Sequence, residues 1–263
     1  MAQANCPHCG GTGWKTVEDG GGVRTALRCD CSTLDRAEKR FERARIPRRY
    51  LDRDFQSFNI DVYDGEVEAP AWNRSLAQAK LLLQAFARDF PAGSESGLLL
   101  MGPCGCGKTH LAIAALKEIL LRGHSGLFYD YRELLKEIQA SYNPESQAKE
   151  IGILEPVLSV DLLLLDDLGA SKPSAWALDT VAHILNARYN EKRVTLMTTN
   201  FLDPRAPLPE AVRAPSGEAL PRPEEFLADR IGQRIRSRLY EMCRTVTVEA
   251  GDFRQRIQHA SHP

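Results

Sequence analysis

One stretch of the sequence, residues 97–109, restricts the possible folds of this chain more than any other. An apolar run at 98–101 leads into a glycine-rich loop that closes with Lys108 and Thr109. The residues that follow, 110–120, repeat apolar side chains at helical spacing. A strand, a G-x-x-x-x-G-K-T loop and a helix in this order predict a phosphate-binding loop.

The residue types of this loop explain how it would hold phosphate. Glycines allow consecutive backbone N–H groups to point inward at phosphate oxygens, and the start of the helix adds its partial positive charge. Lys108 supplies a charge to the β- and γ-phosphates, and Thr109 offers a hydroxyl ligand to Mg²⁺. An unrelated glycine-rich turn is the alternative, which the flanking strand and helix patterns disfavour. We expect the nucleotide to contact Gly102, Pro103, Cys104, Gly105, Cys106, Gly107, Lys108, Thr109 and His110.

Composition limits the classes of protein to which the chain can belong. With 43% hydrophobic and 26% charged residues over 263 positions, it is typical of a globular protein with one sizeable core. A formal net charge of −1 requires any nucleic-acid surface to be a local patch. The sequence has no signal-peptide pattern and no apolar run near the roughly 20 residues of a membrane span. Because seven cysteines, two of them in the loop, disfavour a disulfide framework, we expect a cytoplasmic protein without a membrane partner.

Four cysteines near the N-terminus have the spacing of a metal site. Cys6 and Cys9 form a C-x-x-C pair, and Cys29 and Cys31 form a C-x-C pair. The residues between the pairs predict a β-hairpin that turns at the glycines of positions 20–22. This hairpin would bring the two pairs together in a structural Cys₄ zinc site. A segment this short cannot bury a core of its own, so a metal is expected to stabilise it.

Two alternatives stay open for this module. His8 could replace one cysteine as a zinc ligand, or the four cysteines could be ordinary reduced thiols. Four protein ligands leave no open position for catalysis. We therefore expect the module to present a surface to a partner.

Residues 34–70 are predicted as a basic helical linker that continues into an irregular segment. Between positions 36 and 53 there are eight basic residues and three acidic ones, and Pro47 interrupts the helical pattern. The basic side chains could touch nucleic acid, or they could form the solvated face of a helix with i,i+4 ion pairs. Beyond the linker, residues 73–90 predict an amphipathic helix.

Two further strands are predicted to end in polar residues beside the loop. Residues 160–169 contain four consecutive leucines, which suit a strand buried on both faces of a parallel sheet. Asp166 would enter the Mg²⁺ shell and Asp167 would position or deprotonate the attacking water, as in a Walker B motif. Residues 194–200 predict a second buried strand, and Asn200 at its end would hydrogen-bond the γ-phosphate or the water.

The motifs occur in an order that resembles one group of ATPases. They are GPCGCGKT (102–109), LLLLDDLG (162–169), TTN (198–200) and RIRSRLYEMC (234–243), the last followed by DFR (252–254). From about residue 55 to 254 the chain is similar to the AAA+ ATPases of the DnaC/DnaI helicase-loader and IstB family. The N-terminal cysteines resemble the zinc-bearing, helicase-binding end of the DnaI-like loaders.

The resemblance implies roles for individual residues. Asn200 is similar to sensor 1, Arg254 to sensor 2, and Arg238 to the arginine finger that reaches the γ-phosphate of a neighbouring subunit. The predicted helices within 131–156 resemble an insertion that lines a path for single-stranded DNA. The implied catalytic set is Lys108, Asp167, Asn200, Arg238 and Arg254. As alternatives, Arg238 could face solvent or DNA with the other arginines of its helix, and Arg254 could form a surface salt bridge.

Two departures from the family pattern bear on activity. AAA+ proteins generally have Glu at the position of Asp167, and the shorter side chain implies slow hydrolysis. Only nine residues follow Arg254. The helical lid typical of AAA+ proteins is therefore minimal, and a neighbouring protomer or a partner would complete the pocket.

The sequence therefore predicts an α/β fold, an AAA+ P-loop NTPase with a five-stranded parallel sheet flanked by helices. A minimal lid and a preceding zinc-binding module complete the prediction. We expect a zinc-binding, partner-docking module at 1–33, the linker at 34–70 and the AAA+ ATPase domain at 71–263.

The resemblance implies a slow ATPase, stimulated by DNA or a partner, that uses ATP, Mg²⁺ and Zn²⁺. It would form a homo-oligomer on ATP binding and load a DnaB-like replicative DNA helicase onto single-stranded DNA. One alternative is an IstB-like transposition helper acting on duplex DNA, which the cysteine module disfavours. Another is a nucleotide-stabilised adaptor with little turnover, which Asp167 in place of Glu favours.

Overall fold

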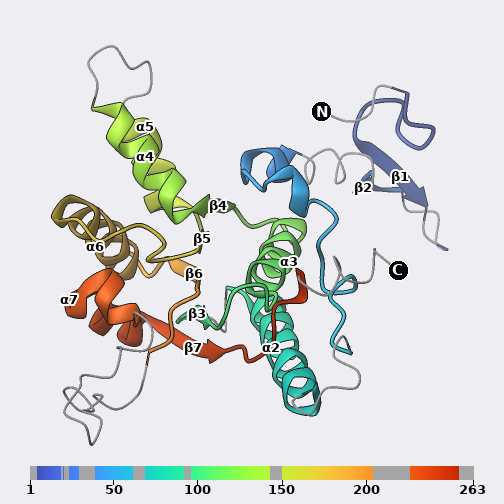
Figure 1. Ribbon diagram of the computed structural model, residues 1–263. Helices are drawn as coiled ribbons and strands as arrows, with labels where there is room; N and C mark the ends of the chain where they lie inside the picture. Colours follow the sequence, from blue (N-terminus) through green and yellow to red (C-terminus); the bar gives the residue numbers. More distant parts are fainter. Residues whose placement is uncertain are drawn as a thin grey trace, which may run out of the picture.

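Five parallel strands in the order β4-β5-β6-β3-β7 form the centre of the computed structural model (Figure 1). The structure describes residues 5–18, 20, 24–29, 39–61, 69–91, 96–142, 150–203 and 226–254. The strands are β3 (Gly97–Met101), β4 (Gly126–Asp130), β5 (Leu162–Asp166), β6 (Val194–Thr199) and β7 (Cys243–Thr247). Neighbouring strands are parallel throughout this sheet, which confirms the predicted five-stranded parallel arrangement.

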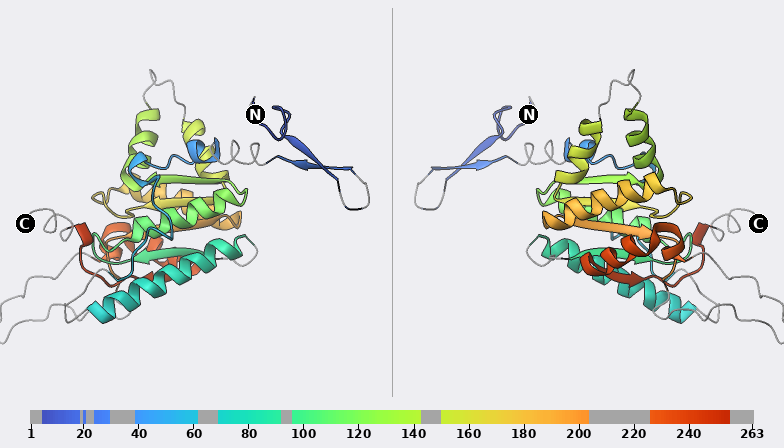
Figure 2. Two further views of the ribbon diagram at one scale, coloured as in Figure 1. Left: turned by 90° about the vertical axis from the view of Figure 1, so that its right-hand side faces the viewer. Right: turned by 90° about the vertical axis from the view of Figure 1, so that its left-hand side faces the viewer.

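The strands are buried on both faces because their apolar residues alternate between two cores. Leu98 and Leu100 of β3 belong to one core, whereas Leu99 and Met101 belong to the other. Helices α2 (Ala69–Asp89) and α3 (Lys108–Leu121) pack in the first core. The second core lies under a helical layer on the opposite face (Figure 2), formed by α4 (Tyr131–Ser141), α5 (Glu150–Ser159), α6 (Ala175–Asn190) and α7 (Leu227–Met242).

The strand order brings the ends of three strands together at one edge of the sheet. β6 lies between β5 and β3, with Met197 beside Leu165 and Thr199 beside Met101. The chain leaves β3 for the far edge strand β4, and such a change of direction creates a crevice at the carboxyl ends of parallel strands. The residues that directly follow β3, β5 and β6 therefore share this crevice.

The predicted helices are confirmed, with one interruption. Gly232 within α7 has φ 75° and ψ 156°, a conformation open almost only to glycine, so the helix is broken there. The residues between β6 and α7, 204–225, fall outside the described residues. Among the helices that the structure describes, none is long and apolar enough to cross a bilayer.

Two short antiparallel strands, β1 (Trp14–Glu18) and β2 (Arg24–Arg28), form the predicted hairpin. Their register pairs Trp14 with Arg28 and Glu18 with Arg24. Each residue of the two strands is exposed or half-buried. The hairpin lies apart from the five-stranded sheet (Figures 1 and 2), and none of its residues belongs to either of the two cores described above.

Residues 39–61, predicted as part of the linker, pack against the sheet over their described length. The backbone N–H of Phe128, on the edge strand β4, donates to the Ala44 carbonyl at 2.8 Å. Phe55 and Phe58 are buried in the core that contains α3. Some of the basic side chains are engaged within the chain: Arg45 pairs with Glu137 and Tyr129, and Arg40 donates to the Leu120 carbonyl. The division between linker and ATPase domain stays a prediction.

Candidate nucleotide-binding site and metal centre

The glycine-rich loop joins β3 to α3 and has the backbone that its sequence requires. Gly105 and Gly107 have φ of 75° and 95°, in the left-handed region that favours glycine. A Cβ atom at Gly105 would lie 1.7 Å from the Asp252 carboxylate, so a side chain there would also require Asp252 to move. α3 begins at Lys108, directly after Gly107. The loop is therefore a backbone concavity at the positive end of a helix.

Lys108 is 4% exposed and its ammonium group lies inside this concavity. It donates to the carbonyls of Gly102 at 2.9 Å and Pro103 at 2.7 Å, and to the Asn200 side-chain oxygen at 2.8 Å. The Cys106 sulfur lies 3.7 Å away. These hydrogen bonds place the ammonium group among neutral oxygens at the loop, where a phosphate-binding lysine is required.

Asp166, at the end of β5, is the centre of a cluster of oxygens. Its carboxylate accepts from the Thr109 hydroxyl at 2.9 Å and from the Thr198 hydroxyl at 2.6 Å. Burial raises the pKa of Asp166 to about 6, the two threonines oppose this shift, and the neighbouring Asp167 adds to it. Hydroxyl and carboxylate oxygens are the ligands that Mg²⁺ prefers, so this pair fits the predicted magnesium site.

Asn200 joins Lys108 to Asp167. Its side-chain nitrogen donates to the Asp167 carboxylate at 2.9 Å, while its oxygen accepts from Lys108. Asp167 has φ 56° and its backbone N–H donates to the Thr198 hydroxyl at 3.0 Å. The structure thus brings together five of the predicted residues, namely Lys108, Thr109, Asp166, Asp167 and Asn200.

The remaining loop residues have distinct surroundings. His110 lies against residues 54–58, with its ring nitrogen 2.8 Å from the Asp54 carbonyl oxygen and its ring edge-on to Phe58. Burial lowers the pKa of His110. Cys104 is exposed, and burial raises the pKa of the Cys106 thiol. Contact between the nucleotide and these three residues stays a prediction.

Arg254 lies next to the loop. The backbone N–H of Phe253 donates to the Gly105 carbonyl at 3.3 Å, and that of Arg254 to the Asp252 carboxylate at 2.9 Å. Burial raises the pKa of Tyr50, and Arg254, Asp166 and Asp167 all act electrostatically on the same hydroxyl. The Arg254 side chain is exposed, and its role as sensor 2 stays a prediction.

Arg238 lies elsewhere, between α6 and α7. Its guanidinium donates to Asn186 at 2.9 Å and to Glu241 at 2.5 Å, and it stacks 4.6 Å above the Tyr189 ring. A cavity of about 330 Å³ adjoins it. These contacts do not reach the loop of the same chain, which is compatible with a finger for a neighbouring subunit; that role stays a prediction.

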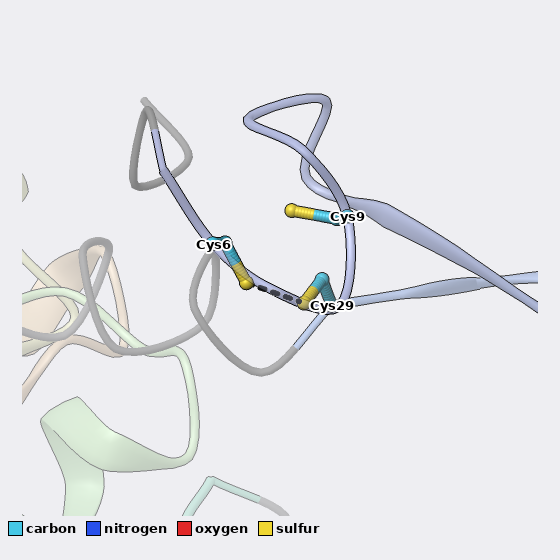
Figure 3. Close-up of side chains that lie close together, drawn as sticks. All are labelled: Cys6, Cys9 and Cys29. Atoms are coloured by element: carbon cyan, nitrogen blue, oxygen red, sulfur yellow. Dashed lines mark hydrogen bonds between the residues drawn. The ribbon is translucent and has the colours of Figure 1, made fainter.

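Three N-terminal cysteines form a compact cluster (Figure 3). The sulfurs of Cys6, Cys9 and Cys29 lie within 4.8 Å of one another, and those of Cys6 and Cys29 are 3.6 Å apart. Thiolates bonded to zinc at about 2.3 Å in a tetrahedron lie about 3.8 Å apart, so the cluster fits Zn²⁺. The Gly13 N–H donates to the Cys9 sulfur at 3.3 Å.

The fourth predicted zinc ligand, Cys31, lies outside the described residues. His8, the alternative ligand, is exposed and does not belong to the cluster that the described part of the module forms. Two other contacts were not predicted. Thr198 supports both aspartates, and Phe58 covers Gly107. The T-T-N pattern offered a signal for Thr198, since it stands two residues before Asn200 on a strand adjacent to β5.

Comparison with known proteins finds similarity to ATP-binding proteins and helicase loaders. A family model described as "IstB-like ATP binding protein" matches residues 71–203. The replicative helicase loader DnaC of Escherichia coli K12 is 25% identical over 180 residues, which cover 68% of each chain. The replicative helicase loader DnaI of Bacillus subtilis is 26% identical over 110 residues, which cover 41% of this chain and 34% of that protein. A crystal structure of the DnaC helicase loader superposes with a TM-score of 0.57 and 28% identity, covering 76% of this chain and 99% of that one.

Proposed function

The chain belongs to the IstB-like ATP-binding protein family, and from this premise we propose that it loads a replicative DNA helicase onto single-stranded DNA with the use of ATP. The observation that carries the proposal is the contact network from Lys108 through Asn200 to Asp167, beside Asp166 and Thr109. This network gathers at one crevice the side chains that phosphate binding, Mg²⁺ binding and water activation would need within one protomer. The similarity to the DnaC and DnaI loaders points to the substrate.

Each residue of the network has a task in ATP hydrolysis. The loop and Lys108 bind the phosphates, and Thr109 and Asp166 hold Mg²⁺, which neutralises phosphate charge when bound. Asp167 accepts a proton from the attacking water or orients it, and Asn200 holds Asp167 relative to the γ-phosphate. The short Asp167 side chain makes turnover slow unless DNA or a partner improves the alignment.

The remaining parts of the chain carry the partners. ATP bound between protomers engages Arg238 of one protomer with the nucleotide of the next, so ATP binding drives homo-oligomer formation. Arg254 contacts the nucleotide in its own protomer. The α4–α5 insertion contacts single-stranded DNA. The cysteine cluster binds Zn²⁺ and presents the β1–β2 hairpin to the helicase.

One other function is favoured by a specific observation. Asp167 in place of the usual Glu, tied to Asn200, suits a nucleotide-stabilised adaptor that binds its partner without turnover. Steady-state hydrolysis with single-stranded DNA separates the two functions. Absence of turnover with DNA and helicase present would favour the adaptor.

Capture of the purified host replicative helicase tests the loading function. We expect the full-length protein to bind the helicase and the Cys6→Ser/Cys9→Ser variant to lose it. The exposed His8→Ala variant, a change in the same turn outside the cluster, is expected to bind normally. No capture by the full-length protein, with ATP-dependent binding of duplex DNA instead, would indicate a transposition helper.

A further inference from the structure

Arg230 is a buried charged residue to which the sequence assigns no role. It lies in the first turn of α7, before the break at Gly232, and is 8% exposed. Its Nε donates to the Gly169 carbonyl and a terminal nitrogen donates to the Ser171 carbonyl, both at 2.8 Å. The guanidinium carbon lies 5.0 Å above the Phe201 ring. Arg230 therefore touches the turn after Asp167 and the residue after Asn200 at once.

The turn that Arg230 contacts holds Asp167 in an unusual backbone conformation. Asp167 has φ 56° and Gly169 has φ 84°, so two residues of a three-residue stretch are left-handed. A non-glycine residue in this region is retained only where its surroundings hold it. Asp167 therefore needs contacts from neighbouring residues to hold its backbone conformation.

β6 supplies that support on one side of the turn. The Asp167 N–H donates to the Thr198 hydroxyl, and the Leu168 N–H donates to the Thr198 carbonyl at 2.8 Å. The Thr199 hydroxyl donates to the Leu168 carbonyl at 2.8 Å. These contacts end at Leu168. Beyond it the Ala170 N–H closes the turn on the Asp167 carbonyl at 3.0 Å, and Arg230 of α7 donates to the carbonyls of Gly169 and Ser171.

Arg230 supplies the support on the other side, and the packing there is close. A Cβ atom on Gly169 would lie 3.0 Å from the Arg230 Cβ and 3.4 Å from the Phe201 ring. The turn, Arg230 and Phe201 are therefore stacked without a gap. A guanidinium suits this place because its planar fork reaches two carbonyls and stacks on an aromatic ring at the same time, which an ammonium cannot do.

We propose that Arg230 is a positioning residue for ATP hydrolysis, which holds Asp167 and Asn200 in their catalytic arrangement by fixing the 169–171 turn against Phe201. This inference rests on the proposed ATPase function. The described contacts of Arg230 are with the carbonyls of Gly169 and Ser171 and with the Phe201 ring, on the side of the site where water would be activated. Loss of Arg230 should therefore slow the chemical step and leave nucleotide binding nearly intact.

The test compares Arg230→Met and Arg230→Lys with Arg244→Met, an exposed arginine on β7 that serves as the matched control. The measurements are the dissociation constant for ATP, the single-turnover rate of bound ATP, and the unfolding midpoint. For Arg230→Met we expect the rate to fall about 10- to 100-fold, because small displacements of catalytic groups have effects of this size. The ATP dissociation constant should change by less than about threefold, since ground-state binding is not touched.

Arg230→Lys keeps the charge and volume near the turn but can reach only one carbonyl. Arg230→Lys is expected to fold and to have a single-turnover rate between that of Arg230→Met and that of the unmodified protein. If Arg230→Met does not fold, the lysine variant alone decides. Unchanged single-turnover rates in a folded variant, with or without a lower unfolding midpoint, would leave Arg230 as a structural anchor only and overturn the inference. Absence of hydrolysis by the unmodified protein under all conditions would instead overturn the proposed ATPase function.

Discussion

The nucleotide site and the cysteine module are built in opposite ways. The nucleotide site takes its residues from the ends of three parallel strands and one helix, and both faces of the sheet beneath it are buried. The module consists of two strands of five residues whose side chains remain exposed or half-buried, together with a cluster of three thiols. Burial of apolar surface therefore stabilises the first site before any ligand binds, whereas we expect the second to require a metal.

The magnitudes support this difference. Each fully buried leucine contributes about 1.5–3 kcal/mol, and β3, β5 and β6 contain several. An isolated two-stranded hairpin is at best marginally stable in water. Structural zinc contributes roughly 10 kcal/mol or more in small modules. We therefore expect the hairpin to fold only when metal binds, whereas the nucleotide binds to a site that is already folded.

Removal of zinc has the largest effect expected. Chelation, or the Cys6→Ser/Cys9→Ser change, should unfold the hairpin, seen as full loss of hydrogen-exchange protection in residues 6–29. Distant sites behave nearly additively, so ATP affinity of the same protein should stay within about twofold. Persistent protection of the hairpin without metal would show that the two regions are stabilised in the same way.

Loss of Lys108 should affect the nucleotide site and leave the cysteine module unchanged. Lys108→Ala removes a buried charge that faces the phosphates, and we expect ATP affinity to fall at least about 100-fold, equivalent to about 3 kcal/mol. Zinc content should not change. Lys117→Ala is the matched control, because Lys117 lies on the same helix and donates to the carbonyls of Leu51 and Arg53. ATP-dependent DNA binding retained by Lys108→Ala would contradict the proposal that ATP bound at this site drives loading onto single-stranded DNA.

Most of the nucleotide site could be predicted because its residues lie at the ends of regular elements. Parallel strands bring their carboxyl ends to one edge, so motifs far apart in sequence, at Lys108, Asp166 and Asn200, had to converge. The same argument placed Asp167 beside them. This argument predicted at which edge of the sheet the site lies and which side chains form it, but it did not predict the hydrogen bonds between them.

The residues that were missed depend on packing between elements without a periodic signal. Four arginines occur on the helix of Arg230, and nothing in their spacing distinguishes the one that is buried against the Gly169 turn. Phe55 and Phe58 lie in a stretch without regular spacing, which we predicted as irregular, yet both are buried. Spacing alone predicted that Cys6, Cys9 and Cys29 lie together, while zinc binding and the part of Cys31 in it stay predictions.

The pH dependence of stability provides a third test, smaller in size. Burial raises the pKa of Asp166 from its usual 3.8 to about 6, so the folded state retains a proton that the unfolded state has lost. This contribution to the free energy of unfolding is complete below pH 3.8, decreases as the pH rises, and is lost above pH 6. Its upper limit is about 3 kcal/mol.

Asp166→Asn removes this proton linkage. In urea titrations without Mg²⁺, the free energy of unfolding of the variant should rise by up to about 3 kcal/mol relative to that of the unmodified protein as the pH is raised from 4 to 7.5. Added Mg²⁺ should no longer stabilise the variant. The exposed Asp179→Asn serves as control. Parallel pH profiles for Asp166→Asn and the unmodified protein would show that folding does not shift the pKa of Asp166.

The smallest effect is expected in the hairpin, and it is the sharpest comparison of the two regions. Trp14 is 54% exposed and its ring lies 5.5 Å from the Arg28 guanidinium, a contact worth about 0.5–1 kcal/mol at an exposed site. Leu99, by contrast, is 1% exposed in the sheet, where Leu→Ala changes cost about 3 kcal/mol. Trp14→Ala should therefore raise the zinc dissociation constant less than about fivefold, measured by competition with a chelator.

The control for that measurement is Leu99→Ala, which should lower the unfolding midpoint of the ATPase domain without any change in zinc affinity. A module held together by its metal tolerates loss of its largest apolar side chain, because the thiols rather than the indole bring the two strands together. A fall in zinc affinity of 100-fold or more, about 3 kcal/mol, would mean that Trp14 packs as a core residue does. The hairpin would then be stabilised in the same way as the sheet, by apolar contacts that the metal only reinforces.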